Sequence, residues 1–328
     1  ADGPSVLFID PGVDDIVARV TGGDLSIINS TIFTSADSTA NLFLINPSGI
    51  QFGPSGQLDL GGGFVGSTAS EIFFDSQTRL PSGTPSTPDS ALLTVSAPVG
   101  LGLLADSTAP VQIRGTGHAL TFSSAVGPAP IIDRSRQQPS LTDVPAENIS
   151  YSAVTARPEQ TFTLVANGIE FIGGNVVVPA GQIELGSVAQ GSVSFNADGI
   201  LDYSQVEEFA DITLAGRSSL DVSATTPGHI IIQGDDLFAT ENTALLAETL
   251  PPEGLSAPTV AGELPAPTAI PAAPTAARPV APTAPAPPAA SGSINLNAAG
   301  DQAISDIETT ESLTGAPNFT TYIGADVG

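Results

Sequence analysis

Short runs of alternating apolar residues, separated by turn-forming clusters, characterise residues 41–69 of the 328-residue chain. Three apolar pairs follow one another at intervals of eight residues: Leu42 and Leu44, Ile50 and Phe52, and Leu58 and Leu60. The clusters between and after them are NPSG (46–49), GPSG (53–56) and GGG (61–63). Alternation with period two predicts strands, and clusters of Asn, Pro, Ser and Gly predict turns. Three runs in one register favour a strand-turn winding that stacks on itself over a single hairpin.

The same pattern returns in residues 161–188 and continues towards Leu237. Its apolar pairs are Phe162 and Leu164, Ile169 and Phe171, Val176 and Val178, Ile183 and Leu185, Val193 and Phe195, Ile212 and Leu214, Leu220 and Val222, and Ile230 and Ile232. Strands this short are unstable alone, but parallel stacking of successive windings buries a shared apolar column. We predict inward positions for all these residues, and for Ile27 and Ile32 in the preceding winding. The fold class is therefore all-β; alternation alone leaves a β-sandwich open as the alternative.

Three segments resemble a known family. Residues 41–69 (NLFLINPSGIQFGPSGQLDLGGGFVGSTA) resemble the filamentous haemagglutinin N-terminal domain, the TpsA-type secretion domain of two-partner secretion exoproteins. IVARVTGG (16–23) also resembles this family, and GGNVVVPAGQIELGSV (173–188) resembles its cyanobacterial-type members. The resemblance implies a right-handed, single-stranded parallel β-helix with extra-helical loops or hairpins.

Composition divides the chain into three parts. Residues 1–250 are expected to form the secretion β-helix, with loop excursions at about 75–90 and 123–160. Compared with the family pattern the opening strands are missing, so we expect an N-terminally truncated piece. Residues 251–290 hold 12 of the 29 prolines and are predicted to be an extended or disordered linker or loop insertion. Residues 291–328 are expected to add a further coil fragment and a tail.

Charge and residue usage exclude several classes of partner. The formal net charge is −26, with eight Arg and no Lys. Nucleic acid and anionic lipid headgroups would both be repelled, whereas solubility in an exposed or extracellular setting is favoured. No apolar run approaches the ~20 residues of a membrane span, so an integral membrane protein is not expected. The absence of Cys excludes a disulfide scaffold and suits a chain that crosses a pore unfolded.

Residue patterns for catalysis or ligand binding are weak. GGGFVG (61–66) satisfies G-x-G-x-x-G, but STASEIFF (67–74) lacks the helix that a dinucleotide site requires. Adjacent acidic residues on a strand point to opposite faces, and His118 and His229 have no ligand spacing. The acidic pairs are Asp14 and Asp15, Glu207 and Glu208, and Asp235 and Asp236. We therefore predict no catalytic, cofactor-binding or metal-binding residue and no enzyme activity. A polysaccharide lyase or hydrolase on a β-helix is the enzymatic alternative.

Arg19 is expected to form a structural salt bridge with a nearby aspartate.

The family resemblance supplies the functional expectation. It implies recognition by periplasmic domains of an outer-membrane barrel transporter, export in an unfolded state, and nucleation of β-helix folding outside. It also implies a secreted or cell-surface adhesin or haemagglutinin with a host-cell or carbohydrate receptor. A structural matrix or surface-layer protein is the alternative.

A short motif is expected to carry secretion or nucleation. Its residues are Asn41, Asn46, Pro47, Ser48, Gly49 and Ile50. The family usually has Asn-Pro-Asn-Gly, so Ser48 is a departure: serine can cap a turn but adopts the left-handed conformation less readily than asparagine. The alternative is that these residues only shape one tight corner.

Overall fold

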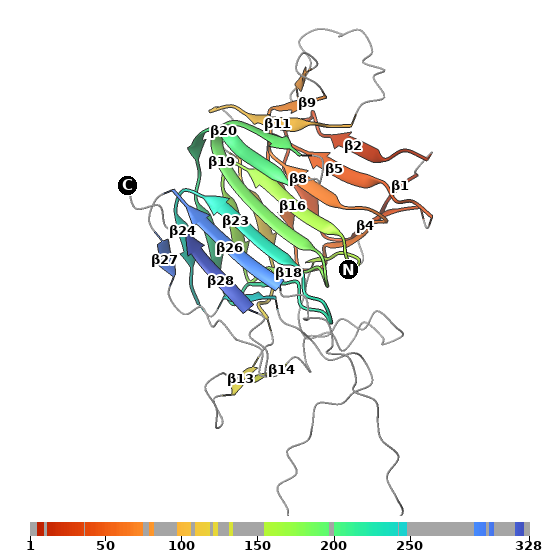
Figure 1. Ribbon diagram of the computed structural model, residues 1–328. Helices are drawn as coiled ribbons and strands as arrows, with labels where there is room; N and C mark the ends of the chain where they lie inside the picture. The colour runs from red at the N-terminus through yellow and green to blue at the C-terminus, as the bar shows by residue number, and fades with distance from the viewer. Residues whose placement is uncertain are drawn as a thin grey trace, which may run out of the picture.

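The computed structural model of the chain contains β-strands and no helix among the residues that it describes. These are residues 5–9, 12–35, 37–74, 79–81, 97–105, 109–118, 121–123, 131–133, 154–196, 200–241, 243–247, 292–299, 302–304 and 319–324. Most strands pair in parallel and form long sheets whose strands follow one another along the stack (Figure 1). No described helix is long and apolar enough to span a membrane.

The parallel strands lie on three faces of one stack. Face 1 consists of β2 (Asp15–Arg19), β5 (Asn41–Ile45), β8 (Phe64–Ser67), β16 (Thr161–Ala166), β19 (Gln182–Phe195), β23 (His229–Gly234), β26 (Gly292–Ala298) and β28 (Phe319–Gly324). Face 2 consists of β3 (Ser26–Ile28), β6 (Ile50–Phe52), β12 (Val111–Arg114), β17 (Ile169–Ile172), β21 (Ile212–Ala215), β24 (Leu237–Ala239) and β27 (Gln302–Ile304). Face 3 consists of β1 (Val6–Phe8), β4 (Thr31–Thr34) and β7 (Gln57–Asp59), followed by β15 (Val154–Thr155), β18 (Asn175–Val177), β22 (Ser219–Asp221) and β25 (Ala244–Leu246).

The chain passes from face 1 to face 2 to face 3 and then begins the next coil. Each strand pairs in parallel with the strand one coil away, as in the register of Leu42 with Phe64 and of Phe64 with Phe162. Such pairing around three faces defines a parallel β-helix and excludes a β-sandwich, in which strands pair within two facing sheets. The predicted fold class is confirmed.

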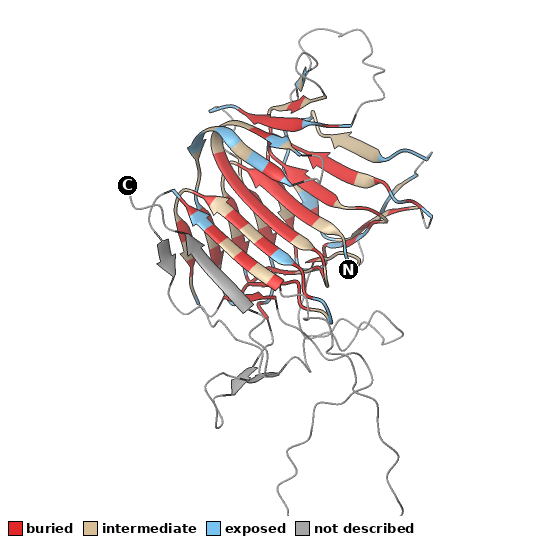
Figure 2. Ribbon diagram, viewed as in Figure 1, coloured by how far each residue is buried: buried red, intermediate tan, exposed pale blue. Residues whose placement is uncertain are grey.

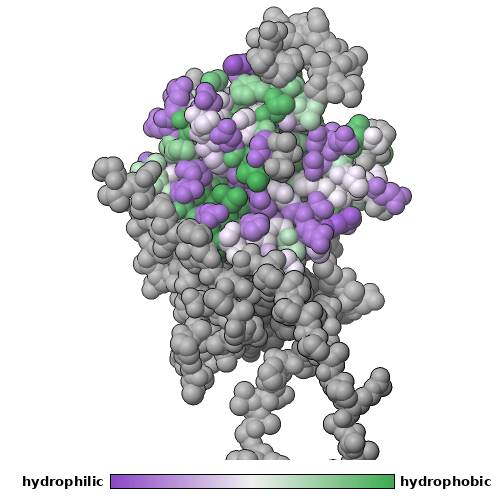
Figure 3. Space-filling model, in the orientation of Figure 1, coloured by the Kyte–Doolittle hydropathy of each residue, from purple (hydrophilic) through white to green (hydrophobic). Residues whose placement is uncertain are grey.

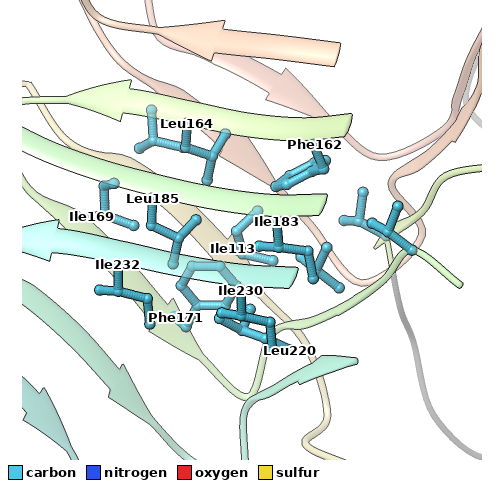
Figure 4. Packing of buried hydrophobic residues seen from close by; sticks show 14 of the residues in the cluster. Ile113, Phe162, Leu164, Ile169, Phe171, Ile183, Leu185, Leu220, Ile230 and Ile232 are labelled. Carbon is cyan, nitrogen blue, oxygen red and sulfur yellow. The ribbon is translucent and has the colours of Figure 1, made fainter. Parts of the chain in front are cut away.

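Inward side chains form one continuous apolar core (Figures 2 and 4). Three fully buried phenylalanines from successive coils lie at its centre. The ring centroid of Phe64 is 5.8 Å from that of Phe52 and 5.6 Å from that of Phe162. The prediction for Ile27 was wrong by one residue: Ile27 is 59% exposed on face 2, whereas Ile28 is buried in the core.

The glycine run at 61–63 lies where two coils approach closely. A Cβ atom on Gly61 would lie 1.5 Å from the main-chain oxygen of Ser38, so no other residue fits without moving the backbone. The residues after the run form strand β8 and not a helix. The dinucleotide interpretation therefore has no structural basis, and close coil packing explains the glycines.

A second, antiparallel sheet lies outside face 1. Strand β19 begins in face 1 and continues into this sheet, where it pairs with β11 (Gly100–Leu103) and β20 (Leu201–Phe209). Strand β9 (Glu71–Phe73) pairs with β11 and with β10 (Arg79–Pro81). The sheet and the outer side of face 1 enclose a second apolar cluster. Its buried members are Phe43, Ile45, Val65, Ala69, Ile72, Leu101, Leu103, Val165, Val188, Val193 and Leu201.

This outer sheet corrects the interpretation of residues 188–209. Val193 was predicted to point into the β-helix, but it is buried in the second cluster, and Phe195 packs against the same cluster. The ring of Phe195 meets that of Phe43 edge to face, with 5.7 Å between centroids. Alternation is the same in a coil strand and in an extra-helical hairpin, so the sequence pattern did not distinguish the two.

The structure describes parts of both predicted loop excursions. Within residues 75–90, β10 belongs to the outer sheet together with β9 and β11, and within residues 123–160, β15 belongs to face 3. Strand β13 (Thr121–Ser123) pairs antiparallel with β14 (Ile131–Asp133). The proline-rich segment 251–290 lies outside the described residues. The strands before and after it, β25 and β26, both belong to the stack.

Candidate functional site

The Asn46 side chain joins two coils at the corner between faces 1 and 2. It is fully buried, and its Nδ2 donates hydrogen bonds to the main-chain oxygen of Asp24 and to Oγ of Ser26, both 2.8 Å long. Its Oδ1 accepts a 2.9 Å hydrogen bond from the main-chain N–H of Ser48. One amide group therefore closes its own turn and fixes the corner of the preceding coil.

The rest of the corner completes a tight turn around Asn46. The N–H of Gly49 donates to the main-chain oxygen of Asn46 over 3.0 Å, and Gly49 adopts a φ of 104°. A Cβ atom there would also lie 2.9 Å from Cδ1 of Leu25. The left-handed conformation thus falls on Gly49, and Ser48 is not among the residues with positive φ. Ser48 supplies only its N–H to the turn, so the departure from Asn-Pro-Asn-Gly leaves the corner geometry intact.

Pro47 and Ile50 have different surroundings in this motif. Pro47 is half-buried within the turn. Ile50 is fully buried, begins β6, and pairs with Ser26 of the preceding coil and Val111 of the following coil. Ile50 is therefore a core residue, and the polar part of the motif is confined to the turn.

Asn41 makes the equivalent connection at the start of β5. Its Nδ2 donates to Oδ1 of Asp15 over 2.9 Å, and its Oδ1 accepts from the N–H of Gly63 over 2.8 Å. Asp15 belongs to the preceding coil and Gly63 to the approach to the following one. Asn41 and Asn46 thus lie at the two ends of one strand and connect three successive coils. The structure thus places Asn46 to Ile50 in one corner and Asn41 at the opposite end of β5.

Later corners have the same kind of polar connection, which the sequence pattern did not predict. Oγ of Ser67 donates to the main-chain oxygen of Val165 over 2.6 Å, and Oγ of Ser187 donates to the oxygen of Asp211 over 2.9 Å. Oγ1 of Thr68 accepts from the N–H of Asn167 over 3.2 Å. The available signal was a polar residue near the end of the alternating apolar run in these coils, at Ser67 and Thr68, at Asn167 and at Ser187. The corner of Asn46 is therefore one of a series of buried polar corners.

The other candidate residues do not assemble a site. His118 is buried beside Arg217, and the main-chain N–H of His118 donates to the main-chain oxygen of Arg217 over 2.7 Å. Nδ1 of His229 lies 2.8 Å from Oγ of Ser293 on the next coil. Within the described part of the chain, no three His, Asp or Glu side chains are grouped as metal ligands. Glu207 and Glu208 are exposed on β20.

The predicted salt bridge of Arg19 is not formed. Its Nη1 donates a hydrogen bond to the main-chain oxygen of Pro81, which ties β2 to strand β10 of the outer sheet. The described ion pairs join Arg79 to Glu71 and Arg157 to Asp59. Arg19 lies on face 1 at a position facing the outer sheet, which places its guanidinium beside the main chain of that sheet.

Replacing Asn46 with alanine is expected to lower the free energy of unfolding by about 2 kcal/mol, because it leaves the oxygen of Asp24 and the N–H of Ser48 without their buried partner. Urea denaturation followed by circular dichroism measures the change. Ser48→Ala is the matched control, since only the main chain of Ser48 contributes to the turn, and it should change stability by less than about 0.5 kcal/mol. Equal stability of Asn46→Ala and Ser48→Ala would contradict the assignment of the corner to the Asn46 side chain.

A stack of three-faced coils, joined at buried polar corners and covered on one face by an antiparallel sheet, defines a β-helical domain without a recognisable reaction centre among its described residues. Residues 1–235 match the family profile described as the TPS secretion domain, so the chain belongs to this family. Neither a curated protein nor a solved structure matches the chain. The predicted resemblance is confirmed: the chain is an exoprotein of a two-partner secretion system, whose members are exported through an outer-membrane partner.

Proposed function

We propose that the chain directs its own export through an outer-membrane transporter and that the corner formed by Asn46, Pro47, Ser48 and Gly49 starts its folding outside. The observation that carries this proposal is the double connection made by Asn46, which closes a local turn and binds the preceding coil at once. Its cross-coil partners lie only 20 and 22 residues earlier in the chain. Contacts of such short sequence separation form early, because little loop entropy is lost on closing them.

Burial of Asn46 limits when a transporter could bind this motif. The side chain is fully buried in the folded domain and its hydrogen-bonding atoms are engaged by the main chain and by Ser26. A partner can contact this side chain only before the coil closes. We therefore propose that periplasmic domains of the transporter bind the motif in the unfolded chain, and that coil formation outside then removes it from the partner.

Adhesion or haemagglutination, attachment to the bacterial surface, and a host-cell or carbohydrate receptor are functions that the family name suggests. A matrix or surface-layer role remains the structural alternative. The family is one of secreted exoproteins and not of enzymes, which supports the prediction of a non-enzymatic protein.

Secretion with and without the cognate transporter tests the proposal. We expect the wild-type chain to appear outside the cell only when the transporter is present, and we expect Asn46→Ala to reduce the protease-resistant exported protein several-fold. Ser48→Ala should be exported like the wild type. Export without the transporter would contradict the proposed route. Normal amounts of folded Asn46→Ala outside would contradict the role of the corner and leave Asn46 a stabilising residue only.

A further inference from the structure

One carboxyl group is enclosed between the β-helix and the outer hairpin formed by β19 and β20. Glu184 belongs to the face 1 part of β19 and points outward, between the inward residues Ile183 and Leu185. The outer sheet covers this side of face 1, and Glu184 is fully buried beneath it, as is the outward residue Val165. It lies beside Thr163 and Ile231 of the neighbouring coils, in the row that also contains Val65.

Strand β20 of the hairpin supplies two of the polar contacts of Glu184. The hydroxyl of Tyr203 on β20 donates to Oε1 of Glu184 over 3.2 Å, and the main-chain N–H of Leu201 also donates to the carboxylate. Nε2 of Gln182, from β19 itself, donates to Oε2 over 3.1 Å. The ring of Tyr203 rests on Gly186, where a Cβ atom would lie 2.5 Å from the tyrosine oxygen. The hairpin is thus seated directly over the carboxyl group.

Burial makes the charged form of this carboxyl unfavourable. Loss of solvation raises the pKa of Glu184 from 4.5 to about 7, although the hydrogen bonds from Leu201, Tyr203 and Gln182 act in the opposite direction. Burial also raises the pKa of Tyr203 well above its usual value, with the charge of Glu184 contributing, so the phenol stays neutral when the carboxyl ionises.

No described cation compensates the carboxylate. On β23, Glu184 pairs with Ile231, and the nearest titratable residue on that strand is His229, two residues before Ile231. The side chain of His229 is exposed and hydrogen-bonds to Ser293. On β20, Asp202 is exposed and adds no positive charge. The facing positions of β16, Thr161 and Thr163, are uncharged. The described strands around Glu184 therefore offer hydrogen bonds but no opposite charge.

We propose that Glu184 is a pH-controlled latch for the outer hairpin, holding β20 against face 1 while the carboxyl is protonated and releasing it when the carboxyl ionises. Opening the hairpin removes Tyr203 and Leu201 from above the carboxyl and admits water, so the charged form gains solvation only in the open state. The same opening exposes apolar residues of the second cluster, including Val193 and Phe43. This device is separate from the export role and does not depend on it.

Hydrogen exchange of main-chain amides tests the latch. We expect the amides of β20 to be less protected than those of β17 and β21, because the hairpin opens without unfolding the coils. Between pH 5 and pH 8, after correction for the intrinsic exchange rate, the opening equilibrium of β20 should rise about 70-fold. In Glu184→Gln, whose side chain has the same shape and no charge at either pH, it should stay constant.

Two results would overturn the proposal. Equal protection of β20, β17 and β21 at each pH would show that the hairpin opens only with the whole domain. A pH dependence that survives unchanged in Glu184→Gln would place the responsible group elsewhere. Gln182→Ala serves as a second variant, since it removes the polar partner on the face 1 part of β19 and leaves the partners on β20, Leu201 and Tyr203, in place. It should keep the pH dependence, and loss of that dependence in Gln182→Ala alone would also contradict the latch.

Discussion

Phe162→Ala is expected to lower the free energy of unfolding by about 3–5 kcal/mol, the largest loss that we predict for a single substitution in this chain. Phe162 is fully buried at the centre of the stack, where its ring lies 5.6 Å from that of Phe64 and 6.5 Å from that of Phe52. Removing the ring loses the free energy gained by burying it away from water. It also leaves a cavity that the neighbouring coils cannot close, because the spacing of the coils is fixed by main-chain hydrogen bonds.

The position of Phe162 in the chain adds to this effect. Phe162 begins the coil that follows both long excursions, and it pairs with Phe64, which is 98 residues earlier. The contact between these two rings therefore joins parts of the stack that the excursions separate along the chain. In a stack where each coil forms its main-chain hydrogen bonds only with its neighbours, weakening one interface weakens the connection between the two ends.

Urea denaturation followed by far-ultraviolet circular dichroism measures the loss in Phe162→Ala. Phe238→Ala is the control, since Phe238 lies on β24 with its side chain half-buried on the outer surface of face 2, and it should cost much less. Similar losses in the two variants would contradict the placement of Phe162 at the centre of the core. A small loss in both would indicate that the coils close around the missing ring.

Glu184 is expected to make the stability of the wild-type domain fall as the pH rises. Its pKa is about 7 in the folded chain and 4.5 in the unfolded chain, so between these values the unfolded state releases the proton first. The stabilisation that depends on the protonated carboxyl is complete below pH 4.5, declines between pH 4.5 and 7, and is lost above pH 7. The shift corresponds to about 3 kcal/mol.

Glu184→Gln should remove this decline and make the domain more stable than the wild type at pH 8 by up to about 3 kcal/mol. The measurement is the free energy of unfolding at several pH values between 4.5 and 8.5, taken as the difference between variant and wild type so that other carboxyl groups cancel. Glu170→Gln is the matched control, because Glu170 is half-buried on face 2 and accepts a 2.7 Å hydrogen bond from Gln112. A Glu184→Gln curve parallel to that of the wild type would contradict the burial of a titrating carboxyl at this position.

The sequence by itself determined the short strands, the turns between them and the location of the sharpest corner, whereas the choice of a β-helix over a β-sandwich came from the family resemblance. Pairs such as Leu42 with Leu44 and Ile183 with Leu185 alternate with period two, and turn-forming clusters fix where each strand ends. Stacking of successive coils buries the apolar sides of these short strands, so local pattern and global fold agree. Asn46 and Gly49 were identifiable because turn chemistry depends on residue type within four residues.

Only the tertiary structure decided which outward side chains are covered. Phe43 and Glu184 both point away from the β-helix core, and period-two alternation assigns both to the solvent side. A hairpin folded back from β19 buries them together with Val193, whose alternation looks the same as that of a coil residue. Burial of these residues depends on contacts between face 1 and the outer sheet. A local sequence pattern does not encode contacts between two sheets. For the same reason the sequence could show that Glu184 is an acid, whereas its raised pKa follows from the hairpin that excludes water from it.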